Sequence, residues 1–153
     1  MTTCNEKSKG VQKELLRIIQ SNDIQPILEI IAITIDEVRA DSKQLPQLYN
    51  RICPLIPARS KYNKRYWMAA YVLHYSRAQF KELLDALKKV DHEIRKLYKY
   101  LGNLEKKDKR RKRKDVLSLE YLYSMTLENL YELQHNRKVI LEEVKRIVRK
   151  LVE

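Results

Sequence analysis

Residues 80–101 read FKELLDALKKVDHEIRKLYKYL, and this stretch decides the fold class. Its apolar residues recur at steps of three and four, the spacing of one face of an α-helix. The pattern predicts an amphipathic helix of about six turns, ended by Gly102 and Asn103 because these residue types favour the conformation that closes a helix. The apolar face comprises Phe80, Leu83, Leu84, Leu87, Val90, Ile94, Leu97, Tyr98 and Leu101.

The opposite face of the same helix carries a second stripe that is mostly cationic. Five of its seven positions are Lys or Arg, and the stripe extends about 33 Å at 1.5 Å per residue. A row of this length could follow several phosphates of a nucleic acid. The alternative is an ordinary solvated face with ion pairs such as Asp85–Lys89. The stripe comprises Arg77, Lys81, Asp85, Lys88, His92, Arg95 and Lys99.

The rest of the chain is also typical of helices. Among 153 residues there are 2 glycines and 4 prolines, and 34% are charged, which favours long surface helices over a turn-rich β fold. We expect an all-α, compact bundle of five to six helices forming a single domain over residues 1–153. Three further helices are expected over residues 11–19, 24–38 and 61–75, the last capped by Ser60, and a short one follows Asp41 or Ser42. The segment Cys53–Ser60 is expected to be a loop.

A last, long helix is expected to begin at Asp115 or Ser118, with apolar residues in a heptad spacing typical of coiled coils. Unbroken, it would extend about 54 Å, so we expect a break near Gln134–Arg137 or an exposed end that contacts a partner. Arg137 occupies a seam position, where a cation is costly unless it is paired. The heptad positions are Val116, Leu119, Tyr123, Thr126, Leu130, Leu133, Arg137, Ile140, Val144, Ile147 and Leu151.

The net charge of +12 is concentrated between Lys61 and Lys114. Such an asymmetry favours a polyanionic partner over a general aid to solubility. Residues 106–114 read KKDKRRKRK within a predicted basic, solvated loop at 103–115; such runs occur in localisation signals, RNA-binding arms and solubilising loops. Lys61, Lys64 and Arg65 lie at the start of a helix, where a bound phosphate would offset their unfavourable interaction with the helix dipole. The candidate nucleic-acid-binding residues are Lys61, Lys64, Arg65, Arg77, Lys81, Lys88, Arg95, Lys99, Arg110, Arg111 and Arg113.

The sequence contains none of the motifs that carry common enzyme chemistry. It lacks a glycine-rich phosphate loop, HExxH and CxxC, and its two cysteines, Cys4 and Cys53, are far apart. We therefore expect a non-catalytic protein without a cofactor or metal. Neither a signal peptide nor a membrane span is recognisable, and the cysteine usage fits the cytoplasm.

Several segments together resemble a known family. They are ILEIIAITIDEVR, KQLPQLYNRI, KRYWMAAYVLHYSRAQFKELLDAL and YSMTLENLY, within residues 24–134. Their order resembles the small subunit of type III CRISPR–Cas effector complexes of the Csm type. Gln44, Tyr49, Tyr75 and Arg77 look like the counterparts of family positions, whereas Pro46 stands where the family favours arginine.

The resemblance implies a helical subunit that stacks in several copies along a guide RNA, beside other effector subunits. It would contact the backbones of guide and target RNA without cutting them, in antiviral defence. Arg77, Lys81 and Lys88 would then face RNA phosphates.

Two other hypotheses remain open. The segment PLIP followed by RYWMAAYVL is similar to the helical lobe of large primase subunits, although the cysteines of that lobe's iron–sulfur cluster are missing. The other hypothesis is a helical adaptor that oligomerises through the heptads of its C-terminal helix.

Overall fold

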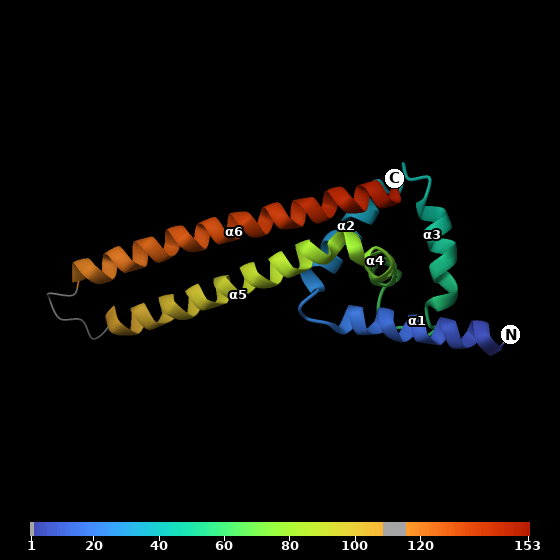
Figure 1. Ribbon diagram of the computed structural model, residues 1–153, viewed down its shortest axis with the longest axis horizontal. Helices are drawn as coiled ribbons and strands as arrows, with labels where there is room; N and C mark the ends of the chain where they lie inside the picture. Colours follow the sequence, from blue (N-terminus) through green and yellow to red (C-terminus); the bar gives the residue numbers. More distant parts are fainter. Residues whose placement is uncertain (1, 109–115) are drawn as a thin grey trace. The chain divides into compact units, whose positions relative to one another are not determined.

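The computed structural model describes residues 2–108 and 116–153, which form an all-α fold (Figure 1). No strand occurs within these described ranges. The predicted fold class, with a long C-terminal helix, is therefore confirmed. The helices are α1 (Thr2–Gln20), α2 (Gln25–Val38), α3 (Leu45–Ile52), the 3₁₀ turn η1 (Cys53–Leu55), α4 (Lys64–Tyr75), α5 (Arg77–Asp108) and α6 (Val116–Val152).

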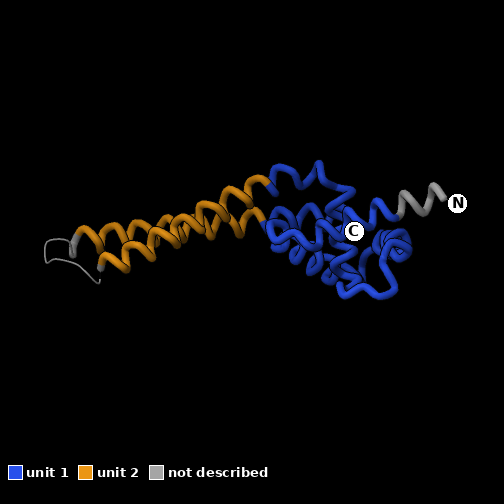
Figure 2. The backbone as a smooth tube through the Cα atoms, turned by 90° about the horizontal axis from the view of Figure 1, so that it is seen from below, with its two compact units in different colours: residues 1–84, 141–153 blue, residues 85–140 orange. Residues whose placement is uncertain are grey.

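The chain divides into two compact units, which Figure 2 distinguishes by colour. Unit 1 comprises residues 1–84 and 141–153, and unit 2 comprises residues 85–140. Helices α5 and α6 each contribute residues to both units. The sequence predicts a single domain, because 153 residues lie within the size range of one domain.

Unit 1 is built around α4, which packs against α1 and α2. Seven consecutive residues of α4, from Trp67 to Leu73, are buried. A helix that is apolar on all sides needs neighbours on all sides. The indole Nε1 of Trp67 donates a hydrogen bond to Ser60 Oγ at 2.8 Å, so the largest side chain of this core leaves no polar atom unsatisfied. Fully buried partners in unit 1 include Leu15, Ile27, Leu28, Ile31 and Phe80.

Helix α4 begins three residues later than the sequence predicted. Its N-cap is Asn63, whose side chain accepts a hydrogen bond from the backbone N–H of Arg65 at 3.1 Å. Ser60, the predicted cap, instead bonds the amide of Tyr62 and the indole of Trp67. The predicted cap of α3 at Asp41 or Ser42 is wrong, because the N-cap is Gln44 and its side chain makes no capping hydrogen bond. Ser42 lies two residues earlier, and its Oγ accepts a hydrogen bond from the N–H of Leu45 at 3.1 Å.

The end of α6 packs into unit 1 with a face that the heptad predicted only in part, because Val144 is a heptad position but Val148 and Val152 are not. Val144, Val148 and Val152 are fully buried at steps of four residues, whereas Ile147 and Leu151 are only half-buried. Beside this face, Glu37 of α2 pairs with Lys145 at 3.0 Å and with Arg149 at 2.9 Å. The buried face of α6 therefore departs from the heptad after Val144.

Unit 2 is an antiparallel pair of helices, formed by the later part of α5 and the earlier part of α6 (Figures 1 and 2). Arg137 Nε donates to Asp91 Oδ1 at 2.8 Å, and Gln134 Nε2 donates to the Tyr98 hydroxyl at 3.1 Å. These bonds set the register of the pair. The buried residues between the helices include Leu101, Leu104, Thr126 and Leu130.

Two predicted features of these helices are wrong. Helix α5 continues through Gly102 and Asn103 to Asp108, because burial of Leu101 and Leu104 offsets the helix-weakening effect of a glycine. Residues 103–108 of the predicted basic loop are thus helical, and residues 109–115 lie outside the described residues. Helix α6 has no break at Gln134–Arg137, and the cation at its seam is accommodated by Asp91. Among the described helices, none combines the length and apolarity that crossing a membrane requires.

Candidate nucleic-acid interface

Within unit 2, three cations of the predicted stripe share one exposed face of α5. Lys88, Arg95 and Lys99 are all exposed, and their spacings of seven and four residues are those of one helix face. They extend about 16 Å along the helix at 1.5 Å per residue. None of them forms an ion pair with another residue in the described part of the chain. Their charges are therefore available to an external anion.

The ion-pair alternative for this face finds limited support. Lys89 and Asp85 form no ion pair among the described residues, and Lys96 pairs with Glu93 at 3.6 Å. Both side chains of that single pair are more than half exposed, so it contributes little to stability. Lys106 follows Lys88 by 18 residues, or about five turns, and is also exposed. The same face thus remains cationic to the last turn of α5.

The part of the stripe in unit 1 is different, because Arg77 is already engaged. Its guanidinium bonds the carboxylate of Glu14, which Arg17 also contacts at 2.5 Å. Hydrogen bonds from Arg17 and Arg77 lower the pKa of Glu14 below its ordinary value. Lys81 is exposed and has no ion-pair partner among the described residues. Arg77 therefore ties α5 to α1, and of these two predicted contacts Lys81 is the one whose charge is available.

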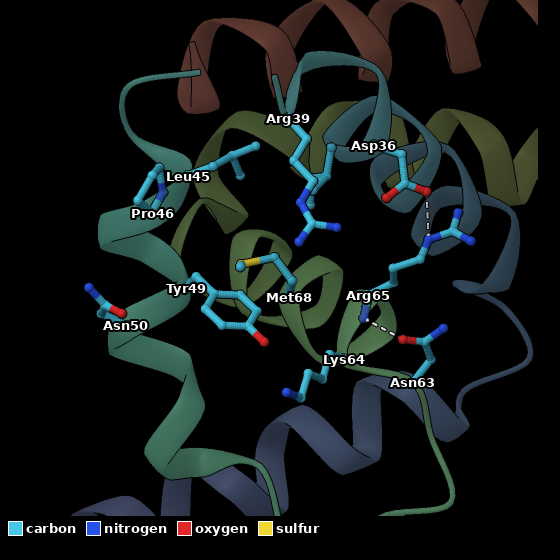
Figure 3. Close-up of a pocket in the computed structure, with 11 residues that line it drawn as sticks. Asp36, Arg39, Leu45, Pro46, Tyr49, Asn50, Asn63, Lys64, Arg65 and Met68 are labelled. Atoms are coloured by element: carbon cyan, nitrogen blue, oxygen red, sulfur yellow. Dashed lines mark hydrogen bonds and ion pairs between the residues drawn. The ribbon is translucent and has the colours of Figure 1, made fainter. Parts of the chain in front are cut away.

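The cations at the start of α4 lie beside a groove, which Figure 3 shows with its lining residues. Lys64 and Arg65 line it, whereas the ammonium of Lys61 lies over the Tyr62 ring, 5.6 Å from the centroid. Arg65 Nε pairs with Asp36 at 2.8 Å. The sequence did not single out Arg39, which enters the groove from the end of α2, because this cation is isolated in sequence.

The aromatic residues of α4 differ in burial. Trp67 and Tyr71 are buried, whereas Tyr75 is 59% exposed, with its ring against Tyr71 at a centroid distance of 4.4 Å. In unit 2, Tyr121 and Tyr131 are 65% and 76% exposed. They lie off the heptad seam of α6, and this off-seam position is the signal that could have identified them.

The exposed cations of this arrangement can attract anions. No cluster of three His, Cys, Asp or Glu side chains suited to a metal occurs in the described part of the chain. The predicted contacts Arg110, Arg111 and Arg113 lie outside the described residues. The predicted residues thus fall into separate sets: α5 of unit 2, the start of α5, and the groove beside α4.

Comparisons with family models, with curated proteins and with solved structures found no match to this chain.

Proposed function

We propose that the chain is a non-catalytic RNA-binding protein that holds the RNA backbone on the exposed face of α5 in unit 2. The observation that carries the proposal is the row Lys88, Arg95 and Lys99, which are exposed and lack carboxylate partners among the described residues. Cations on a helix face reach phosphates without reading bases. We therefore expect little sequence preference.

Electrostatics favours a polyanion over a single anion at this face. The three side chains are spread over about 16 Å, too far apart to converge on one phosphate group. Each contact with a strand would release a condensed counterion. Binding to such a row gains affinity mainly from the number of phosphates contacted, which suits an extended strand.

The specific role we propose is that of a small subunit in a type III CRISPR–Cas effector ribonucleoprotein. This assignment rests on the resemblance of residues 24–134 to the Csm-type small subunit. In that role, several copies would line up along guide and target RNA, and neighbouring subunits would supply any cutting activity. The exposed row on α5 is compatible with this arrangement.

A titration with single-stranded RNA tests the binding proposal. The test variant is Lys88→Gln, Arg95→Gln, Lys99→Gln, and the matched control, with the same charge change, is Lys43→Gln, Arg51→Gln, Arg59→Gln. We expect the test variant to bind at least about tenfold more weakly and the control to bind nearly as the wild type does. If both variants lost affinity for RNA equally, the loss would follow from net charge alone, and the assignment of the binding face to α5 would be overturned.

A third variant separates the contribution of α5 to RNA binding from that of the charge run, residues 106–114. If Arg110→Gln, Arg111→Gln, Arg113→Gln abolishes RNA binding while the α5 variant retains it, the principal contact belongs to the charge run. Matched DNA and duplex RNA titrations then identify the preferred polymer. A preference for DNA over both forms of RNA would contradict the proposed ligand.

The exposed face of α6 supports a second candidate function, a helical adaptor that self-associates. Residues 118–136 contain Glu120, Glu128 and Glu132 but no Lys or Arg, in a chain of net charge +12. A surface of this kind complements the cationic face of α5 on a second copy. The exposed large apolar residues of this segment are Tyr121, Leu122, Tyr123, Met125, Leu127 and Tyr131.

A substitution tests the adaptor hypothesis more directly than a truncation does. Removing the chain after Gln134 would also remove Val144, Val148 and Val152 from the core of unit 1. The variant Tyr121→Ser, Tyr131→Ser leaves both cores intact. Light scattering should find an oligomer in the wild type and a monomer in the variant, and a monomeric wild type would count against the adaptor.

A further inference from the structure

A groove in unit 1 lies between the end of α2, helix α3 and the start of α4 (Figure 3). Its volume is about 660 Å³, within the range of pockets that hold small ligands. All of its lining residues belong to unit 1. The groove is therefore a feature of one compact body and is separate from the α5 face in unit 2.

The charges around the groove leave two cations without a carboxylate partner. Three cations and one carboxylate line it, and Asp36 is paired with Arg65 at 2.8 Å. Arg39 and Lys64 form no ion pair within the described residues. In Figure 3 the Arg39 side chain extends into the groove from the end of α2, and Lys64 of α4 lies at its edge, beside Tyr49. The backbone N–H of Arg65 is already bonded to Asn63. An anion would therefore be held by side chains rather than by the helix terminus.

Beside these cations the groove has an apolar and aromatic wall. The Tyr49 ring stands over the groove, and the ammonium of Lys64 lies 5.6 Å from its centroid. A hydrogen bond with the Tyr49 side chain raises the pKa of Lys64. Leu45, Pro46 and Met68 continue the apolar wall. An inorganic anion would leave this wall exposed to water, whereas a planar ring carried by the anion would cover it.

We propose that this groove binds a nucleoside phosphate, with the phosphate between Arg39 and Lys64 and the base against Tyr49 and Met68. A phosphate monoester has close to two negative charges near neutral pH, which matches the two unpaired cations. Two sources share this chemistry, a free nucleotide and the phosphorylated end of an RNA strand. The inference goes beyond the proposed function, because it needs neither the α5 face nor an extended strand.

Methionine-methyl NMR tests the proposal directly in the wild-type protein. The chain has 3 methionines; Met68 lines the groove, and Met125 lies on the exposed face of α6. Addition of adenosine 5′-monophosphate should shift the Met68 methyl signal and leave that of Met125 unchanged. An unshifted Met68 signal at millimolar nucleotide would overturn the proposal. The α5 triple variant should respond as the wild type does, so this test is independent of the RNA-binding proposal.

Substitutions and ligand analogues identify the groups that bind. Arg39→Gln and Lys64→Gln should each weaken nucleotide binding about ten- to hundredfold, since each removes a charge-assisted hydrogen bond. Arg51→Gln is the matched control, because Arg51 is an exposed cation of α3 outside the groove. Weakening by the control to the same extent would contradict the assignment. Binding of inorganic phosphate, or of unphosphorylated adenosine, as tightly as the nucleotide would also contradict the assignment.

The source of the nucleotide follows from competition between RNA strands. If a 5′-phosphorylated RNA displaces the mononucleotide better than the same strand with a 5′-hydroxyl, the groove holds a strand end. Equal displacement by the two strands, with the mononucleotide binding more tightly, assigns a free nucleotide. Either result supports the groove as a nucleoside phosphate site.

Discussion

The interhelix ion pairs of unit 1 and the exposed row of α5 in unit 2 use positive charge in opposite ways. In unit 1, Arg65, Arg77, Lys145 and Arg149 each contact a carboxylate of another helix and so connect parts of the fold. In unit 2, the exposed cations of α5 face solvent without such partners among the described residues. Whether a cation stabilises the fold or can bind a ligand therefore depends on its ion-pair partner, and not on its place in a basic stripe.

The units also differ in how they are packed. Unit 1 surrounds α4 on nearly all sides, whereas unit 2 buries a single stripe between two helices. Core substitutions should therefore cost more in unit 1.

The largest effect is expected for Trp67→Ala, because Trp67 is 1% exposed and fills the centre of unit 1. We expect a loss of about 4 kcal/mol in the free energy of unfolding, against about 2–3 kcal/mol for Leu101→Ala in unit 2. Urea unfolding followed by far-UV circular dichroism and by amide hydrogen exchange would separate the two units. A larger loss for Leu101→Ala would contradict the packing comparison.

A smaller effect is expected for the ion pair that crosses unit 2. Arg137 and Asp91 have side chains that are 32% and 31% exposed, and they are joined at 2.8 Å. A double-mutant cycle with Arg137→Met and Asp91→Asn should give a coupling energy of about 1 kcal/mol. Arg137→Met alone should leave Asp91 without its partner. A coupling energy near zero would mean that the pairing of Arg137 with Asp91 does not contribute to stability.

Unit 1 should lose stability on mild acidification because of His74. Its Nδ1 is buried without a hydrogen-bond partner among the described residues, and burial, then the charge of Arg77, lowers its pKa. A lowered histidine pKa means that the unfolded chain binds more protons near pH 6.5 than the native one. The free energy of unfolding of unit 1 is then highest above about pH 6.5 and decreases as the pH falls below that value.

Thermal unfolding between pH 7.5 and 5.5 measures this dependence. The range stays above the region in which Glu14, whose pKa is lowered, would contribute, since that stability is lost only as the pH falls below about 4.5. His74→Gln should flatten the dependence, and His92→Gln, at an exposed position of α5, should leave it intact. A slope equal in all three proteins would assign the dependence to other groups.

The smallest effect is expected at Glu37, which pairs with both Lys145 and Arg149. Hydrogen bonds from Arg149 and Lys145 lower the pKa of this carboxyl. Glu37→Gln should lower the melting temperature slightly at low salt and hardly at all at 1 M salt, because exposed ion pairs are screened. A salt-independent loss would indicate a packing role instead.

Much of the fold could be predicted because helix periodicity is local. Residues 80–101 form a helix as predicted, and the helix predicted over residues 24–38 is α2, Gln25–Val38. The helix boundaries at Gly102 and Ser60 were wrong, because burial of Leu101 and Leu104 and the indole of Trp67 are tertiary effects. The division into units has no sequence signal, since α5 and α6 continue through it.

The candidate sites were predictable only in part. The exposed row of α5 follows from the stripe, but its separation from Arg77 depends on Glu14, which is 63 residues away in sequence. The groove could not be predicted, because Arg39, Tyr49 and Lys64 come from three different helical segments. Such convergence is a property of the packed unit.

The salt dependence of RNA binding tests the central claim most directly. Affinity for single-stranded RNA is measured at several salt concentrations for the wild type, the Lys88, Arg95, Lys99 variant and the Lys43, Arg51, Arg59 control. If three phosphates are contacted by α5, the slope of log affinity against log salt should be shallower by about 2 in the α5 variant and unchanged in the control. Parallel slopes for all three proteins would contradict the claim that α5 holds the RNA.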